Sequence, residues 1–377
     1  MPNPFKPTAG ARPPLLIGRQ QVLDEFGIAL EDGPGAPGRL SLLTGARGVG
    51  KTVLLTEMGE SARARGWVVV DETVTPGLLG RLVDAAAAAV ASLDTTPHGG
   101  RRVSGLTVAG VGGMVFEAAP RQDRPGLQMA LEQLIDALEA HGVGLLVTVD
   151  EVHKKGMPEL RQLAAVHQHL VRRDRDVALA LAGLPSSVEA LLGDDVLTFL
   201  RRAERVTLAD VPLPAVRQSL GRTFDGSGRT IRPEALDAAT AATGGYPFMV
   251  QLVGYHVWRA AHDGVVDLAA AEAGVAAARV RLGSTVHEAN LNALSAVDRT
   301  YLVAMAQDEG ASRTVEVARR LDRDMRYQSV YRDRLIAAGI IRPAGHGLVE
   351  FAVPYLGEYL REHAARYEMQ DRGGSRG

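Results

Sequence analysis

Cysteine is absent from this sequence of 377 residues. Its absence excludes disulfide bonds, zinc sites built from thiolates and thiol nucleophiles, and it fits a reducing compartment. Long apolar runs are also lacking, since none reaches the roughly 18 residues that a membrane-spanning helix needs. We therefore expect a cytoplasmic protein that has no membrane partner.

The chain also has little net charge of either sign. It carries 42 basic and 44 acidic residues, which give a formal net charge of −2 and a pI of about 6.6. Without an overall positive field, any contact with nucleic acid must come from a local cluster. The length suffices for two or three domains, and a hydrophobic content of 46% is ample for their cores.

A glycine-rich motif, G-x-x-x-x-G-K-[ST], stands at residues 45–52. The run 40–44 before it predicts a buried strand, and residues 53–58 after it predict the start of a helix. Such glycines let the backbone curl so that successive N–H groups, at a helix N-terminus, point at a phosphate chain. Lys51 would bring a charge to the outer phosphates, and Thr52 a hydroxyl to Mg²⁺. The predicted nucleotide contacts are Gly45, Ala46, Arg47, Gly48, Val49, Gly50, Lys51, Thr52 and Val53.

The acidic half of such a site is expected at the end of a second apolar strand. Residues 145–149 (Leu-Leu-Val-Thr-Val) lead directly into Asp150 and Glu151. Asp150 is the predicted Mg²⁺ ligand, because a hard cation prefers carboxylate oxygens. Glu151 is the predicted general base that polarises the attacking water.

Hydrophobic periodicity divides the chain into segments. From residue 15 to 210, apolar strands alternate with helices, which indicates an α/β core around a parallel sheet. Residues 211–285 show only helical patterns, split by glycine-rich turns, with helices expected at 215–224, 233–243 and 247–261. Residues 286–365 predict three helices followed by two strands, the order of a winged helix-turn-helix. The proline-rich residues 1–14 and the glycine-rich residues 366–377 are expected to be a flexible N-terminus and a disordered tail.

Further short segments add to the two motifs: residues 17–20 (Ile-Gly-Arg-Gln), 244–247 (Gly-Gly-Tyr-Pro), and 329–335 with 351–356. Together these features resemble P-loop ATPases of the AAA+/STAND assemblage, in particular archaeal-type ATPases and origin-recognition-like initiators. The resemblance covers roughly residues 15–365. It implies a P-loop ATPase core, a helical lid, a C-terminal winged helix, and ATP and Mg²⁺ as cofactors.

Within this resemblance, Gly18 and Arg19 match the family's Gly-Arg-Glu motif near the adenine pocket, with glutamine in place of glutamate. Pro247 matches the Gly-x-Pro motif of the lid, which approaches the nucleotide. The chain departs from the family in its sensors: the first has no well-placed polar residue, and residues 248–257 contain no arginine to act as the second. This departure implies slow hydrolysis, as in a switch.

Two arginines, Arg201 and Arg202, precede residues 206–208, the expected last strand of the core. The resemblance implies an arginine finger at this place, which would reach the γ-phosphate of a neighbouring subunit in a homo-oligomer. The alternative is a solvated pair at a helix end, where cations suit the dipole. The sequence does not distinguish the two arginines.

An arginine-rich stretch covers residues 313–342, where eight arginines and four acids give a local charge of about +4. Contacts to the phosphates of double-stranded DNA require such a patch. The third helix of a winged helix would then place Arg326, Gln328, Ser329 or Arg332 near bases. The alternative is a surface for a protein partner, with arginines paired to acids at helical spacing. A hairpin expected at residues 103–117 is a second candidate contact surface.

Two functional hypotheses follow. In the first, the chain binds and slowly hydrolyses Mg-ATP, and its nucleotide state controls DNA binding or assembly in replication, transposition or regulation. In the second, it is a STAND-like signalling or defence switch whose winged helix binds a protein or its own ATPase core.

Overall fold

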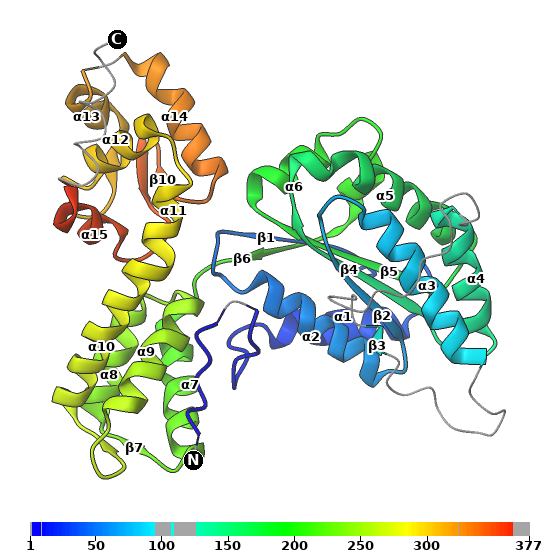
Figure 1. The fold of residues 1–377 in the computed structure, drawn as a ribbon, viewed down its shortest axis with the longest axis horizontal. Coiled ribbons are helices and arrows are strands. Elements are labelled where there is room, and N and C mark those ends of the chain that lie inside the picture. Colours follow the sequence, from blue (N-terminus) through cyan, green and yellow to red (C-terminus); the bar gives the residue numbers. More distant parts are fainter. Residues whose placement is uncertain (1, 9, 95–106, 109–125, 323, 365–377) are drawn as a thin grey trace. The chain divides into compact units, whose positions relative to one another are not determined.

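The computed structural model describes residues 2–8, 10–94, 107–108, 126–322 and 324–364 (Figure 1). They form two compact units. The sheet unit comprises Arg19–Gly45 and Lys51–Leu208, and the helical unit comprises Met1–Gly18, Ala46–Gly50 and Ala209–Gly377. The middle of the glycine-rich loop thus packs with the helical unit, whereas both ends of the loop belong to the sheet unit.

The sheet unit is built around parallel strands in the order β3-β2-β4-β5-β1-β6. Every residue of β5 is buried, which is typical of a parallel sheet covered on both faces. This confirms the α/β fold that the alternating pattern predicts. The strands are β1 (Leu40–Gly45), β2 (Val68–Thr73), β3 (Thr107–Val108), β4 (Leu145–Val152), β5 (Val177–Gly183) and β6 (Glu204–Leu208).

Helices cover both faces of this sheet. In Figure 1, α3, α4 and α5 lie on one face, and α1 and α2 lie on the other. Fully buried leucines such as Leu134 and Leu191 belong to the apolar core on the α3 side. The helices are α1 (Gln20–Glu31), α2 (Lys51–Ala64), α3 (Leu78–Asp94), α4 (Leu127–Glu139), α5 (Met157–Val171) and α6 (Pro185–Leu192), with short 3-10 turns at Lys154–Gly156 and Thr198–Arg202.

Two sequence expectations fall mainly on residues outside the described part of the chain. Of the hairpin expected at residues 103–117, the structure describes only β3, which pairs in parallel with β2. The tail at residues 366–377 lies entirely outside the described residues.

The helical unit begins with a group of long helices around its own apolar core. Tyr246, Phe224 and Met249 are among its most buried side chains. The sequence predicts α7 to α9 here, but α10 and the two short strands were not expected. The elements are α7 (Leu213–Gly226), β7 (Thr230–Ile231), α8 (Pro233–Thr243), α9 (Pro247–Ala260), β8 (Val265–Val266) and α10 (Leu268–Leu282).

The N-terminal segment, which the sequence predicts to be flexible, is packed against these helices. Phe5 is only 3% exposed, and its ring centroid lies 5.4 Å from that of Phe224. The amide of Asn3 donates to the carbonyl of Tyr255 at 3.0 Å. The prediction relied on proline content, whereas the burial of Phe5 and the hydrogen bonds of the segment to α9 offset part of the entropy lost on ordering it.

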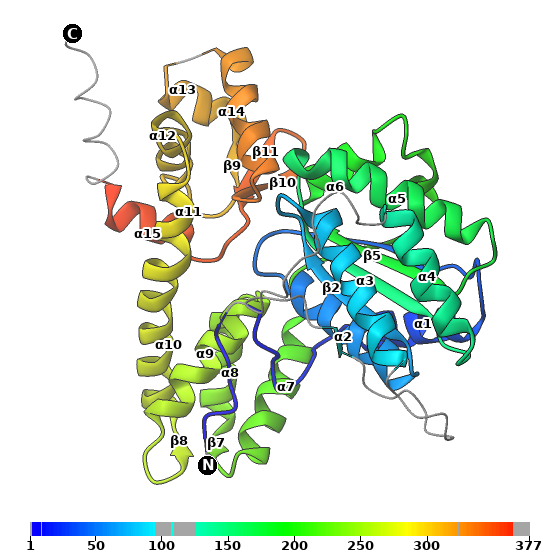
Figure 2. The same cartoon turned by 45° about the vertical axis from the view of Figure 1, so that its right-hand side comes forward.

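The C-terminal part of the helical unit contains short helices and a three-stranded antiparallel sheet in the order β10-β11-β9. In Figures 1 and 2, α10 continues through a π-helical turn, Gly283–His287, into α11. The sequence predicts α12, α13, α14 and two of the strands, and the structure adds β9 and the short helices α11 and α15. The elements are α11 (Glu288–Asn292), α12 (Ala296–Met305), β9 (Ser312–Arg313), α13 (Thr314–Arg320), α14 (Met325–Ala337), β10 (Ile341–Gly345), β11 (Leu348–Phe351) and α15 (Leu356–Glu362).

No helix in the described part of the chain combines the length and the apolar character that crossing a membrane requires.

Candidate functional site

The glycine-rich loop connects the buried strand β1 to the N-terminus of α2, as the sequence predicts. Gly48 and Gly50 have φ angles of 75° and 94°, a region that only glycine enters without strain. No atom of the described residues lies within 4 Å of the position that a Cβ of Gly50 would occupy. In the sheet unit, Lys51 Nζ donates to the carbonyl oxygen of Gly45 at 2.9 Å, so the lysine lies back along its own loop.

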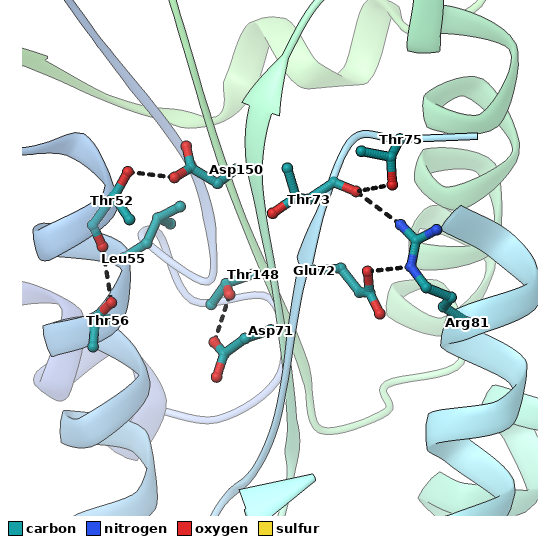
Figure 3. Close-up of a pocket in the computed structure, with 10 residues that line it drawn as sticks. All are labelled: Thr52, Leu55, Thr56, Asp71, Glu72, Thr73, Thr75, Arg81, Thr148 and Asp150. Atoms are coloured by element: carbon teal, nitrogen blue, oxygen red, sulfur yellow. Dashed lines mark hydrogen bonds and ion pairs between the residues drawn. The ribbon is translucent and has the colours of Figure 1, made fainter. Parts of the chain in front are cut away.

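The predicted metal ligands meet beside the start of α2. Thr52 Oγ1 donates to Asp150 Oδ2 at 2.5 Å, and Figure 3 shows the two side chains pointing toward one another. Thr52 comes from the first turn of α2 and Asp150 from the carboxyl end of β4. The structure therefore brings together a hydroxyl and a carboxylate, the hard oxygen donors that Mg²⁺ takes together with phosphates and water.

A β-bulge determines where Glu151 lies. The register between β4 and β5 shifts between Val149 and Val152, and Glu151 has a left-handed φ of 57°. Its backbone N–H donates to Asp150 Oδ1 at 2.7 Å, and its side chain is exposed. A strained backbone at a non-glycine residue costs about 1–3 kcal/mol and is concentrated at functional sites.

A polar cavity of about 490 Å³ opens next to Thr52 and Asp150 (Figure 3). It lies between α2, the carboxyl ends of β2 and β4, and the start of α3. Its lining residues are Thr52, Leu55, Thr56, Asp71, Glu72, Thr73, Thr75, Arg81, Thr148 and Asp150.

The acids of β2 in this cavity were not identified from the sequence. Asp71 accepts hydrogen bonds from Thr148 Oγ1 and from the guanidinium of Arg63, each at 2.6 Å. Glu72 accepts one from Arg81 at 2.8 Å. Asp71 and Glu72 lie at the carboxyl end of β2, and the carboxyl ends of parallel strands share one edge of the sheet, but nothing local in the sequence marks which acids line the cavity.

Tyr246 is a second residue that the sequence analysis missed. Within the helical unit its hydroxyl donates to the carbonyl oxygen of Arg47, in the glycine-rich loop, at 3.0 Å. Burial raises the pKa of this phenol, and the nearby charge of Asp210 raises it further. Arg47 also reaches Asn290 of α11, at 3.5 Å.

The remaining predicted nucleotide contacts lie at turns. Gly18 has a left-handed φ of 65°, and a Cβ there would lie 3.9 Å from Val211 Cγ1 in the same unit. Arg19 precedes α1 in the sheet unit, and Pro247 is the first residue of α9. Their contacts with a nucleotide stay predictions.

Both candidate finger residues, Arg201 and Arg202, lie on the 3-10 turn immediately before the edge strand β6. Both side chains are exposed, and Arg201 Nε donates to the carbonyl of Leu192 at 3.0 Å. An edge position suits a contact with another subunit, and it equally suits a solvated pair.

The four candidate DNA-contacting residues differ in exposure. Arg326 is exposed, whereas Ser329 and Arg332 are half-buried. Arg332 pairs with Asp333 at 2.9 Å. Gln328 does not fit the prediction, because it is only 4% exposed and its side chain is enclosed in the domain. Gln328 lies on the same helix as Arg326, α14, but on the face of this helix that packs inward.

Several arginines of the 313–342 stretch are neutralised by acids. These pairs are Arg319–Glu316, Arg320–Asp308, Arg334–Asp298, Arg342–Asp210 and Arg342–Glu350. Four of these five carboxylates lie outside the stretch, namely Asp210, Asp298, Asp308 and Glu350. The local charge of +4 counted from the sequence therefore overstates the field that this surface presents.

Comparisons with known proteins support the P-loop ATPase fold. Residues 36–192 match the model of a family described as an AAA domain, and residues 284–360 match a domain of unknown function (DUF8462). A search among curated proteins finds no match. The Walker-type ATPase PABY2304 of Pyrococcus abyssi is similar in structure, with a TM-score of 0.65 and 16% identity over 92% of this chain and 96% of that one.

A second solved structure, the Aeropyrum pernix ORC1 protein in complex with DNA, matches with a TM-score of 0.45 and 16% identity over 95% of each chain. The predicted resemblance to P-loop ATPases is confirmed by the family match and by the fold shared with the Pyrococcus protein. Residues 36–192 of this chain thus match an AAA domain, and the chain shares its fold with the Walker-type ATPase of Pyrococcus abyssi.

Proposed function

We propose that this protein binds Mg-ATP, hydrolyses it slowly, and uses its nucleotide state to control what its C-terminal domain binds. The observation that carries the proposal is the Thr52–Asp150 pair at 2.5 Å beside a glycine-rich loop. Two hard oxygen donors fit Mg²⁺, which usually keeps phosphate and water ligands in addition to one or two from the protein. The absence of cysteine supports a location in a reducing cytoplasm.

Each residue of the loop has a task in this proposal. The N–H groups of Gly45 to Lys51 bind the phosphates, and Lys51 leaves the Gly45 carbonyl to reach the outer ones. Thr52 and Asp150 hold Mg²⁺, which when bound neutralises charge on the phosphate oxygens. Glu151 orients the attacking water and accepts its proton. Gly18, Arg19 and Pro247 border the base.

In this proposal, hydrolysis is completed between subunits. Arg201 or Arg202 stands on an exposed turn before an edge strand, from which a guanidinium could reach the nucleotide of a second copy. An arginine at that place stabilises the charge of the transition state. A homo-oligomer with composite sites is thus part of the proposal.

The proposed target of the C-terminal domain is double-stranded DNA. We interpret α12 to α14 with the sheet β10-β11-β9 as a winged helix, in which α14 would enter a major groove. Arg326, Ser329 and Arg332 are its remaining candidate contacts. Binding that depends on a few arginine–phosphate contacts must weaken steeply as the salt concentration rises.

A second candidate function is a switch whose winged helix binds a protein or the chain's own domains. The ion pairs favour it, because arginines held by Asp298, Asp308 and Asp210 are less available to phosphates. A contact of the C-terminal domain with α8, inside the helical unit, also favours this second function. There, Tyr355 Oη donates to the carbonyl of Ala242 at 2.7 Å.

One experiment separates the two candidates. Duplex-DNA binding is measured by fluorescence anisotropy with the Glu151→Gln protein, in ATP, in ADP and without nucleotide, across a salt series; Lys51→Ala is the control. Binding that requires ATP and weakens steeply with salt supports the DNA-binding proposal. Absence of binding in every state contradicts it and favours the protein-partnered switch.

A further inference from the structure

The glycine-rich loop is held from one side by Tyr246, which stands between α8 and α9. The turn before it consists of Gly244 and Gly245, with φ angles of 58° and 78°. A Cβ on Gly245 would lie 2.3 Å from the carbonyl oxygen of Val211, so this backbone approach needs glycine. The N–H of Val211 in turn donates to the Gly245 carbonyl at 2.7 Å. These contacts fix the position of the Tyr246 side chain, which is 1% exposed.

The Tyr246 ring lies directly against Gly48. A Cβ on Gly48 would lie 1.9 Å from the tyrosine Oη and 2.5 Å from Cζ. The hydroxyl donates to the carbonyl of Arg47, the residue just before Gly48. Yet Gly48 remains exposed, so the tyrosine covers only one side of the loop.

The hydrogen bond to Arg47 has a consequence for the next N–H group. The Arg47 carbonyl and the Gly48 N–H belong to one planar trans peptide unit, in which they point in opposite directions. When Tyr246 fixes the carbonyl, it therefore turns the Gly48 N–H to the other side of the loop. An N–H group on that open side is available to a phosphate oxygen.

We propose that Tyr246 is a positioning residue for phosphate binding: it holds the Arg47–Gly48 peptide so that the Gly48 N–H faces the nucleotide phosphates. This inference rests on the proposed function, in which the loop binds ATP. A phenol has an ordinary pKa near 10 and is protonated at neutral pH, and burial raises the pKa of Tyr246 further, so the hydroxyl remains a donor. Tyr246 itself touches no reacting atom.

The test is Tyr246→Phe, which removes the hydroxyl and keeps the ring on Gly48. We measure the affinity for a fluorescent ATP analogue, and for inorganic tripolyphosphate by competition, each with Mg²⁺. Tripolyphosphate reports on the phosphate loop alone. The loss of one neutral hydrogen bond that orients a binding group should weaken both ligands by about 3- to 10-fold.

The matched control is Tyr355→Phe, which also removes a tyrosine-to-carbonyl hydrogen bond inside the helical unit, but one whose acceptor, Ala242, is not part of the glycine-rich loop. It should leave both affinities unchanged. A thermal melt without nucleotide reports any purely structural effect of either change.

Equal affinities of Tyr246→Phe and wild type would overturn the inference, as would a loss for ATP without a loss for tripolyphosphate. A loss of the same size in Tyr355→Phe would also overturn it, since the effect would then be general destabilisation. These outcomes leave the proposed function standing. That function fails by a different result, namely wild-type nucleotide affinity in Lys51→Ala.

Discussion

Thr52 and Asp150 are 98 positions apart in the chain, and in the structure the threonine hydroxyl donates to the aspartate at 2.5 Å. The contact exists because β4 lies near the middle of the parallel sheet and ends at the same edge as β1, from which the loop leads to α2. A hydroxyl at a helix N-terminus beside a carboxylate can supply the protein's part of the Mg²⁺ coordination sphere.

The backbone of Glu151 predicts a conflict between stability and activity. Glu151→Gly relieves the left-handed strain at φ 57° and should raise the free energy of unfolding by up to about 1 kcal/mol. The same change removes the proposed general base, so ATP turnover should fall by at least about 100-fold. Thermal melts and steady-state phosphate release check both parts. Unchanged turnover would remove Glu151 from this role.

Glu151→Gln separates binding from hydrolysis at the same position. The amide keeps the size of the side chain but cannot accept the proton of water. We expect ATP to remain bound while hydrolysis slows, as measured by single-turnover kinetics. Equal rates in the variant and in wild type would contradict the assignment.

Gly48→Ala should abolish nucleotide binding. Its Cβ would collide with the Tyr246 hydroxyl, and a left-handed φ of 75° adds strain. Gly33→Ala is the matched control, because Gly33 also has a left-handed φ, 94°, but nothing within 4 Å of its Cβ position. Equilibrium binding of a fluorescent ATP analogue should distinguish the variants. Normal binding by Gly48→Ala would show that the loop is not constrained as described.

Burial of His167 predicts acid sensitivity of the sheet unit. Desolvation lowers its pKa from 6.5 to about 4, and in the described part of the chain neither ring nitrogen has a hydrogen-bond partner. Unfolding therefore takes up a proton between those pH values, and stability falls as the pH is lowered through that window, by about 1.4 kcal/mol per pH unit. Denaturant melts of wild type and His167→Leu from pH 7 to 4 check this. The variant should show a flatter dependence, and identical slopes would contradict the assignment.

Two arginines of the C-terminal domain should behave in opposite ways. Arg326 is exposed, so Arg326→Ala should weaken the proposed DNA binding and leave the melting temperature unchanged. Arg334 pairs with Asp298, whose side chain is only 4% exposed, so Arg334→Ala should cost about 1–3 kcal/mol of stability by leaving a buried carboxylate short of a partner. Anisotropy and thermal melts check the two effects. Equal DNA binding by Arg326→Ala and wild type would exclude Arg326 as a contact.

The sequence predicts a phosphate site from a local signal. The loop from Gly45 to Thr52 needs particular residues at fixed spacing. Asp150 directly follows an apolar run that predicts a buried strand. Asp71 was missed, although it also follows a buried strand, because nothing local marks which acids line a cavity. Tyr246 was missed because its role depends on a contact with Arg47, 199 positions away.

The prediction of secondary-structure elements failed where the hydrophobic periodicity of the sequence carries no information. Helix α10 (Leu268–Leu282) is rich in alanine, whose small side chains sit on all its sides, so no single apolar face stands out. Gln328 shows the converse case. Its polarity and its place among arginines suggested exposure, whereas the packing of α14 buries it. Tertiary contacts determine both the presence of helix α10 and the burial of Gln328, and neither follows from composition.

The central claim is that Thr52 and Asp150 bind Mg²⁺ together with ATP, and equilibrium binding of ATP with and without Mg²⁺ tests it most directly. We would measure it by calorimetry for wild type, Asp150→Asn and Lys51→Ala. Our account predicts that Mg²⁺ strengthens ATP binding in wild type, that Asp150→Asn loses this gain, and that Lys51→Ala loses affinity with and without the metal. Equal dependence on Mg²⁺ in wild type and Asp150→Asn would contradict it.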